Sequence, residues 1–241
     1  GLVLVLNGDG FLGFERLVTG HHARVVERAD GTRRIARAAD HKKDQSYVLH
    51  MLDQDRLAGL ELPVGDLTKD QVRVRAGDLG LCTADKPDSQ DVCFITSRHG
   101  RDDFLRRRIP LTPGRVVDGS GAEVGRVDAV ELVTLGQRRG MALAGGAGPR
   151  YATGVDTSTA TVTVGTADDL LVDTTPVDRP VWAAGPVMGP VLAQTSAHGG
   201  AVPALLEDGL VRWEVPHRRV APGQSVVFYD GDQVLGGATA G

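Results

Sequence analysis

The sequence has few cysteines, no long apolar run and no excess of basic residues. Only two of its 241 residues are cysteines. That number is too small for a disulfide-stabilised scaffold and favours a reducing compartment. No run of about eighteen apolar residues occurs, so no membrane-spanning helix is expected. The N-terminal segment GLVLVLNGDG lacks a basic region and a long apolar stretch, which excludes a typical secretory signal. We therefore expect a cytoplasmic protein that does not enter a membrane.

The formal net charge of -4 excludes a uniformly basic nucleic-acid-binding protein, but it leaves room for a local basic face. Between Arg24 and Lys43 there are seven Lys or Arg residues against three Asp or Glu residues. Such a run is either a solvated face or a surface that contacts phosphates. The sequence also lacks an initiator Met, as a truncated start or a processed chain would.

The first of three blocks, residues 1–104, mixes helix and strand signals. The expected elements are a strand at 17–19 that ends in a turn at Gly20, a helix at 44–57 capped by Asp44, a capped helix at 66–76 and a buried strand at 92–95. Because helices and strands alternate, this block is predicted to be an α/β sheet domain.

The remaining two blocks show β patterns. Residues 105–173 include a clean apolar–polar alternation at 159–164, which predicts a half-buried strand in a small β-rich domain. Residues 174–241 contain apolar stretches separated by Gly, Asp and Pro turns, at 180–182, 201–206, 210–215 and 225–229. Several short strands spaced by such turns predict a C-terminal β-barrel.

Cys93, in the segment KPDSQDVCFI, is the first candidate for chemistry. A cysteine flanked by apolar residues is most often a small buried hydrophobic side chain. The alternative is a sulfur nucleophile or carrier, which requires a lowered pKa of the thiol and some access to solvent. We interpret Cys82 as structural or incidental.

Four polar turns are further candidates, and each is also explained by a plain solvated loop. Gly20 after an apolar strand permits a close approach of the backbone to a ligand. The other three turns are the lysine-rich helix start at 42–46, the basic turn at 135–140 and the Pro-Gly turn at 221–225, in which Gln224 is an exposed polar tip. No metal site is predicted, because His21 and His22 are adjacent and no further ligand cluster is evident.

Taken together and in this order, these segments resemble the tRNA-specific 2-thiouridylase (MnmA) family. The matching segments span residues 19–237 and read TGHHARV, KDQSYVL, VGDLTKDQVR, ADKPDSQDVCFI, PGRVVD, TLGQRRGM and VAPGQSVVFYDGDQVLGG. The resemblance implies a partial adenine-nucleotide-hydrolase-like (Rossmann-like) α/β domain, then a small β-rich central domain and a C-terminal β-barrel.

The resemblance also implies a reaction, in which sulfur replaces the C2 oxygen of the wobble uridine in tRNA. ATP, with Mg²⁺, would adenylate that oxygen, and a cysteine persulfide would then supply the sulfur by covalent catalysis. A second cysteine would help to release the sulfur and leave a disulfide. The implied partners are tRNA and a sulfur-donor protein, either a cysteine desulfurase or a relay protein.

Residues carried over from the family motifs give each candidate an expected role. Cys93 matches the persulfide-bearing cysteine, and Gly20 matches the glycine whose backbone contacts ATP. The expected tRNA contacts are His21, Lys43, Asp44, Gln45 and Gln224.

Several features of the sequence depart from the family pattern. The phosphate-binding SGGVDS loop and the first cysteine motif are absent and would lie upstream of Gly1. Ser196 stands where the family often has an Arg before Ala-His-Gly. We therefore expect little or no thiolation by this chain alone. The alternative is a non-catalytic tRNA-binding remnant of such an enzyme.

Overall fold

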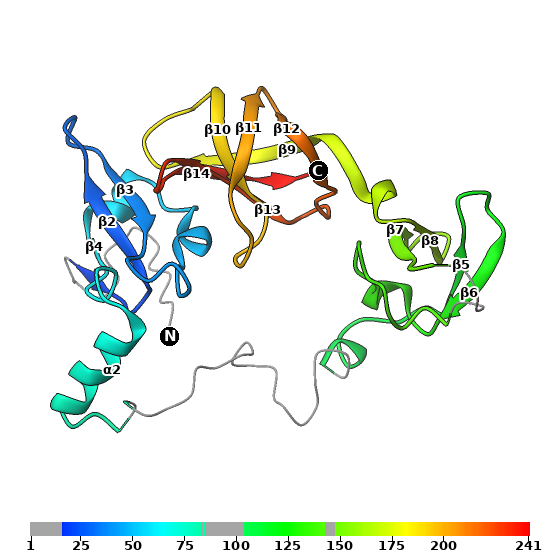
Figure 1. Ribbon diagram of the computed structural model, residues 1–241, viewed down its shortest axis with the longest axis horizontal. Helices are drawn as coiled ribbons and strands as arrows, with labels where there is room; N and C mark the ends of the chain where they lie inside the picture. Colours follow the sequence, from blue (N-terminus) through cyan, green and yellow to red (C-terminus); the bar gives the residue numbers. More distant parts are fainter. Residues whose placement is uncertain (1–15, 83, 85–103, 143–147) are drawn as a thin grey trace. The chain divides into compact units, whose positions relative to one another are not determined.

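The computed structural model describes residues 16–82, 84, 104–142 and 148–241 (Figure 1). Contacts divide the chain into two compact units. The first unit joins the N-terminal segment, up to residue 86, to residues 173–215 and 222–241, and the second contains residues 87–172 and 216–221. Cys93 and the strand expected at 92–95 lie outside the described residues.

The N-terminal segment contains a parallel strand pair and a β-hairpin. Strand β1 (Leu17–Val18) pairs in parallel with β4 (Leu60–Glu61). A parallel pair needs a long crossover connection, as α/β domains provide. The hairpin consists of β2 (Ala23–Glu27) and β3 (Arg33–Arg37), and its turn includes Gly31 at a φ of +79°. The predicted strand at 17–19 is thus confirmed, whereas the hairpin within the basic run was not predicted.

The prediction of a single helix at 44–57 is wrong. The chain instead forms a short 3-10 helix, η1 (Ser46–Leu49), followed by α1 (Gln54–Ala58), whose N-terminus is capped by the Asp53 side chain. Asp44 caps neither helix, because its carboxylate is engaged by partners described below. The second predicted helix is confirmed as α2 (Lys69–Asp78), which begins with a capping box between Thr68 and Gln71.

A closed barrel of six strands forms the C-terminal part of the first unit, which confirms the predicted fold. Its strands are β9 (Leu171–Trp182), β10 (Gly189–Gln194), β11 (Val202–Glu207), β12 (Leu210–Arg218), β13 (Ser225–Asp230) and β14 (Gln233–Ala240). Their order is β13-β10-β11-β12-β9-β14, and antiparallel pairing of β13 with β14 closes the ring. Gly236 has a φ of +155°, and a Cβ there would collide with the Val181 carbonyl, so close strand packing at this point requires glycine.

The N-terminal hairpin extends the barrel sheet and shares its core. Strand β3 pairs with β14 at Ala36 and Gln233, and the Arg37 amide donates to the Asp232 carbonyl at 2.9 Å. In Figure 1 the blue hairpin accordingly lies beside the red end of the barrel. One buried cluster contains residues of both parts: Ala23, Ile35, Leu57, Leu60, Leu62, Ala183, Val227, Tyr229 and Val234. Burial of each large apolar side chain contributes about 1.5–3 kcal/mol, so the two parts stabilise each other.

The second unit is a four-stranded sheet with its own core, which agrees with the predicted β-rich centre. Its strands are β5 (Gly114–Val117), β6 (Glu123–Val127), β7 (Tyr151–Asp156) and β8 (Thr161–Gly165), in the order β6-β5-β8-β7. Two short 3-10 helices, η2 (Val130–Leu132) and η3 (Asp168–Leu170), accompany the sheet. Val162 and Val164 are buried in alternation with threonines, as the sequence pattern predicted.

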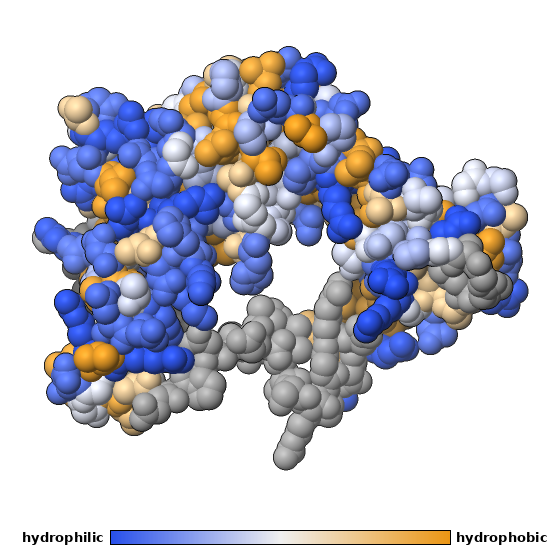
Figure 2. All heavy atoms as spheres, in the orientation of Figure 1, coloured by the Kyte–Doolittle hydropathy of each residue, from blue (hydrophilic) through white to orange (hydrophobic). Residues whose placement is uncertain are grey.

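The surface over residues 16–82 is mostly hydrophilic in the view of Figure 2. Within the described ranges, no helix has the length and apolar character needed to cross a membrane.

Candidate functional site

The turn after β1 leaves Gly20 open to a ligand. Gly20 is exposed, and a Cβ at this position would meet no atom within 4 Å. The turn lies at the carboxyl end of a parallel strand, which is where open α/β sheets bind ligands. The Oγ1 of Thr19 lies 2.8 Å from Nδ1 of His21, which fixes the imidazole in place. Burial lowers the pKa of His21, so near pH 7 this side chain acts as a neutral hydrogen-bonding group.

A second polar element is the segment Asp40–Ser46, called here the lysine loop. His41, Lys42 and Lys43 in it are exposed. The Asp40 carboxylate closes the loop by accepting from the backbone amides of Lys69, at 3.0 Å, and Lys42, at 3.1 Å. These hydrogen bonds, that from Lys69 foremost, lower the pKa of Asp40. The loop therefore presents its lysines from a backbone that is held in a defined shape.

Reciprocal hydrogen bonds join the turn after β1 to the lysine loop. The His22 amide donates to Oε1 of Gln45 at 2.9 Å, and the Gln45 amide donates to the His22 carbonyl at 2.8 Å. Two segments that the sequence analysis singled out separately are therefore in contact, and His21 and Lys43 belong to one continuous part of the molecule.

The Asp44 carboxylate is used inside the protein. Its Oδ1 accepts from the amides of Ala38, at 2.9 Å, and Ser46, at 3.2 Å. Its Oδ2 accepts from the Ser46 hydroxyl at 2.7 Å and from Nη1 of Arg37 at 2.9 Å. The side chain is only 8% exposed. Asp44 therefore shapes the lysine loop, which the sequence alone did not indicate.

Gln224 lies in the turn before β13 and is exposed, as expected. Gly223, with a φ of +85°, forms the turn, and the Gln224 carbonyl accepts from the Ala240 amide at 2.8 Å. The next residue, Ser225, accepts at its carbonyl a hydrogen bond of 2.9 Å from the Tyr47 hydroxyl of η1. All six of the predicted site residues that the structure describes thus belong to the first unit.

The arginines of the basic run are engaged by the barrel and by neighbouring groups. Arg24 pairs with Asp232 at 2.6 Å, and Arg28 donates to Oε1 of Gln233 at 2.7 Å. Because Asp232 and Gln233 belong to the turn and strand at the β13–β14 connection, these arginines hold the hairpin against the barrel. Lys42 and Lys43 of the lysine loop are exposed to solvent.

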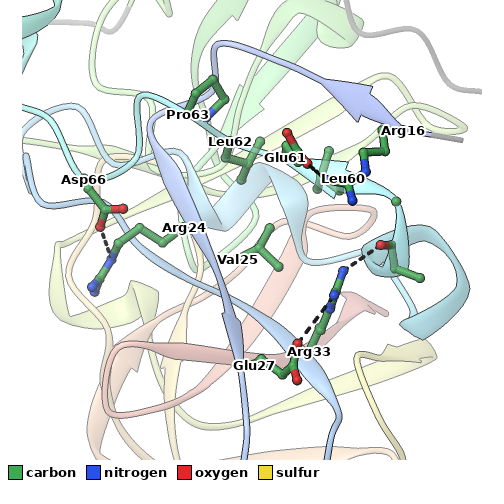
Figure 3. Close-up of a pocket in the computed structure, with 12 residues that line it drawn as sticks. Arg16, Arg24, Val25, Glu27, Arg33, Leu60, Glu61, Leu62, Pro63 and Asp66 are labelled. Atoms are coloured by element: carbon green, nitrogen blue, oxygen red, sulfur yellow. Dashed lines mark hydrogen bonds and ion pairs between the residues drawn. The ribbon is translucent and has the colours of Figure 1, made fainter.

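A groove of about 400 Å³ lies between β2 and the β1–β4 pair (Figure 3). Its lining includes three arginines, each paired with a carboxylate: Arg16 with Glu61, Arg24 with Asp66 at 4.0 Å and Arg33 with Glu27 at 3.4 Å. None of the six candidate residues that the structure describes lines this groove. Sequence reasoning missed it because its walls come from segments that are far apart along the chain.

Among the described residues, no group of three or more His, Cys, Asp or Glu side chains could hold a metal ion. Cys82 is exposed and carries a free thiol.

Comparison with known proteins supports the three-part fold. Residues 6–97 match the tRNA methyl transferase HUP domain, residues 102–166 the tRNA methyl transferase PRC-barrel domain, and residues 195–240 the aminomethyltransferase beta-barrel domain. These matches confirm the predicted order of a nucleotide-binding-type α/β domain, a central β-rich domain and a C-terminal barrel.

Several curated relatives carry the name tRNA-specific 2-thiouridylase MnmA. The protein of Frankia casuarinae is 48% identical over 237 residues, which cover 94% of this chain and 65% of the relative. The protein of Mycolicibacterium smegmatis is 44% identical, over 95% of this chain and 66% of the relative. The protein of Salinispora tropica is 47% identical, over 98% of this chain and 68% of the relative. The chain thus spans about two thirds of the length of these relatives. On this similarity, the chain belongs to the tRNA-specific 2-thiouridylase MnmA family.

Proposed function

We propose that the chain takes part in the 2-thiolation of the wobble uridine of tRNA in the cytoplasm. The names of its relatives and the three matching domains support this proposal. The observation that carries it is the pair of hydrogen bonds between His22 and Gln45, which unites two separately identified polar segments.

The proposed tRNA contacts are His21, Lys43, Asp44, Gln45 and Gln224. Lys43 provides a positive charge for a phosphate, and His21 and Gln224 provide hydrogen-bonding groups. The Asp44 carboxylate is already saturated by internal partners, so we propose that its contribution comes from the backbone. An anticodon loop suits such a site, because its unpaired bases cost little energy to displace from their stack.

For the chemistry, we propose that ATP, with Mg²⁺, is the activating co-substrate and that the Gly20 backbone contacts it. The open space around Gly20 is compatible with this approach. Activation converts the C2 oxygen into a good leaving group. Cys93 is loaded as a persulfide by a sulfur-donor protein, and its outer sulfur bonds to C2 as AMP leaves. A second thiol, which is not among the assigned residues of this chain, then attacks the Cys93 Sγ, so that the S–S bond breaks, the thiolated tRNA is released and a disulfide remains to be reduced.

Binding of tRNA to the chain at several salt concentrations tests the RNA-binding half of the proposal. We expect log K to fall linearly with log salt concentration, and Lys43→Ala to reduce the slope by roughly 0.7–0.9. Arg212→Ala is the matched control, because Arg212 pairs with Glu207 on the barrel and is not a candidate residue. Equal slopes for the parent and Lys43→Ala would contradict the role of Lys43.

Sulfur transfer is measured separately, with tRNA, ATP and a sulfur donor, in a fusion that restores the SGGVDS loop and the first cysteine motif ahead of residue 1, with and without Cys93→Ser. ATP-dependent transfer that is lost in Cys93→Ser supports the catalytic function, and transfer that persists in this variant contradicts the role of Cys93. Binding of tRNA without transfer supports the alternative, a tRNA-binding remnant.

A further inference from the structure

A buried polar network around Arg37 connects the lysine loop to the barrel. Arg37 is the last residue of β3, and its side chain is 20% exposed. Its Nη1 donates to the Asp44 carboxylate at 2.9 Å, and its Nη2 donates to Oε1 of Gln194 at 2.7 Å. The guanidinium also lies over the ring of Tyr229, with Cζ 4.1 Å from the ring centroid. One side chain thus contacts three separate segments of the first unit.

The two hydrogen-bonded partners of Arg37 each control a surface loop. Asp44 fixes the lysine loop through the Ala38 and Ser46 amides. Gln194 is 1% exposed, and its Nε2 donates to the Ser196 carbonyl at 2.8 Å. Ser196 belongs to the segment Thr195–Gly200, called here the barrel loop, in which residues 196–200 are all exposed.

A second path through the network reinforces the same connection. Ser46 and Tyr229 are fully buried, and their hydroxyl oxygens are 3.2 Å apart. The Ser46 hydroxyl already donates to Asp44, so the Tyr229 hydroxyl can donate to Ser46. The lysine loop is therefore bonded to strand β13 through Ser46, and to Arg37 through Asp44.

Arginine is suited to this position in a way that lysine is not. Its planar guanidinium presents N–H groups in a fixed fork, so one side chain can hold two acceptors at once while its face lies on an aromatic ring. A lysine ammonium is a point charge, and its flexible stem does not fix the direction of two separate hydrogen bonds. The guanidinium therefore fixes the spacing between the Asp44 carboxylate and the Gln194 side-chain oxygen, the two groups that hold the loops.

We propose that Arg37 is a positioning residue that holds the lysine loop in one fixed place relative to the barrel loop, so that the lysine loop presents its RNA contacts in a single arrangement. This inference rests on the proposed function and adds to it a positioning role for Arg37, which the sequence showed only as one residue of the basic run. Arg37 acts through Asp44 and Gln194, to which its Nη1 and Nη2 groups donate.

The first experiment measures the placement of the loops without RNA. Spin labels are attached through Lys42→Cys and His198→Cys, both at exposed positions, in a chain that also carries Cys82→Ser and Cys93→Ser. Pulsed electron–electron double resonance should give a narrow distribution of distances between the two labels for the parent and a broad one for Arg37→Met. Arg33→Met is the matched control, because Arg33 on the same strand bonds to Glu27 and the Ala58 carbonyl and to neither loop. A distribution that stays narrow in Arg37→Met would overturn the proposal.

The second experiment measures the dissociation constant for an anticodon stem-loop RNA. Arg37→Met should weaken binding about tenfold, as the loss of about 1.4 kcal/mol does. Gln194→Met should weaken binding in the same direction while it leaves the Arg37–Asp44 pair intact, and it serves if Arg37→Met folds poorly. The double variant should bind no more weakly than Arg37→Met, because both changes break the same connection.

Arg37→Lys separates positioning from folding. The ammonium keeps a charge beside Asp44, so most of the thermal stability should return, whereas the narrow label distance and the RNA affinity should not. Full recovery of all three properties would overturn the role of the guanidinium fork. If the parent chain binds no RNA, the proposed function and the RNA part of this inference fall together, and the label distances still decide whether Arg37 holds the two loops.

Discussion

Replacement of Asp44 by alanine tests whether this residue is chiefly a structural element of the lysine loop. The change removes the acceptor for two backbone amides, for the Ser46 hydroxyl and for Arg37. Loss of one partner of a buried ion pair costs about 3–5 kcal/mol. Because Arg37 is 20% exposed and can regain some hydration, we expect the lower end, about 3 kcal/mol of the free energy of unfolding. Asp44→Asn keeps one side-chain oxygen, whose two lone pairs can still accept from the Ala38 and Ser46 amides. This variant should lower the free energy of unfolding by about 1–2 kcal/mol.

Urea denaturation followed by tryptophan fluorescence measures this effect. Both tryptophans, Trp182 and Trp213, lie in the first unit, so their emission reports the unfolding of the part that contains Asp44. Lys42→Ala is the matched control, since substitution of an exposed side chain in the same loop changes stability by about 0.5 kcal/mol or less. The reasoning is refuted if Asp44→Ala is as stable as Lys42→Ala in the absence of RNA.

Three further predictions concern stability and titration. Leu57→Ala, in the core shared by the hairpin and the barrel, should lower the free energy of unfolding by about 2–5 kcal/mol in the same urea assay, and a smaller loss would contradict a shared core. Burial lowers the pKa of His50, which packs against Gly237, so the folded state disfavours its protonation. Its unfolded form takes up a proton near pH 6.5 and its folded form only at lower pH, so stability should fall as the pH drops below about 6.5. His50→Gln should flatten that fall in urea titrations at several pH values. An unchanged dependence of stability on pH in this variant would contradict the role of His50. Hydrogen bonds from Ser158 and Thr159 lower the pKa of Asp156 to about 2, and NMR titration of this carboxyl near 4 would disprove that geometry.

The sequence predicted those parts of the fold that depend on local signals. Turns of Gly, Asp and Pro between short apolar stretches identified the barrel, and the Thr68 cap identified α2. Alternation at 159–164 identified β8, where Val162 and Val164 are buried. In each case the residues that determine the element are close together in the chain.

Predictions failed where partners distant in the chain decide the structure. The apolar spacing at 44–57 predicted one helix, but the chain forms two short helices, and the first is bonded to the barrel through the Tyr47 hydroxyl and the Ser225 carbonyl. The basic run was interpreted as a solvated or phosphate-binding face, because nothing local shows that its arginines meet Asp232 and Gln233 about 200 residues later.

The structure shows where six of the candidate residues lie, and it shows internal contacts that the sequence did not indicate. Gly20 and Gln224 are exposed, as their expected contacts require. Asp44 was expected to meet tRNA, yet its carboxylate is engaged inside the protein. Arg37 was not singled out, because the sequence shows it only as one arginine of the basic run. Its contacts with Asp44 and Gln194 are visible only in the folded structure.

The central claim is that the turn after β1, the lysine loop and the turn at Gln224 together form the tRNA-binding surface. Hydrogen–deuterium exchange of the chain with and without a cognate tRNA tests it most directly. We predict that tRNA slows amide exchange in residues 19–22, 40–46 and 223–225 together, at the same tRNA concentration. Protection confined to other segments, or to only one of these three, would contradict the account.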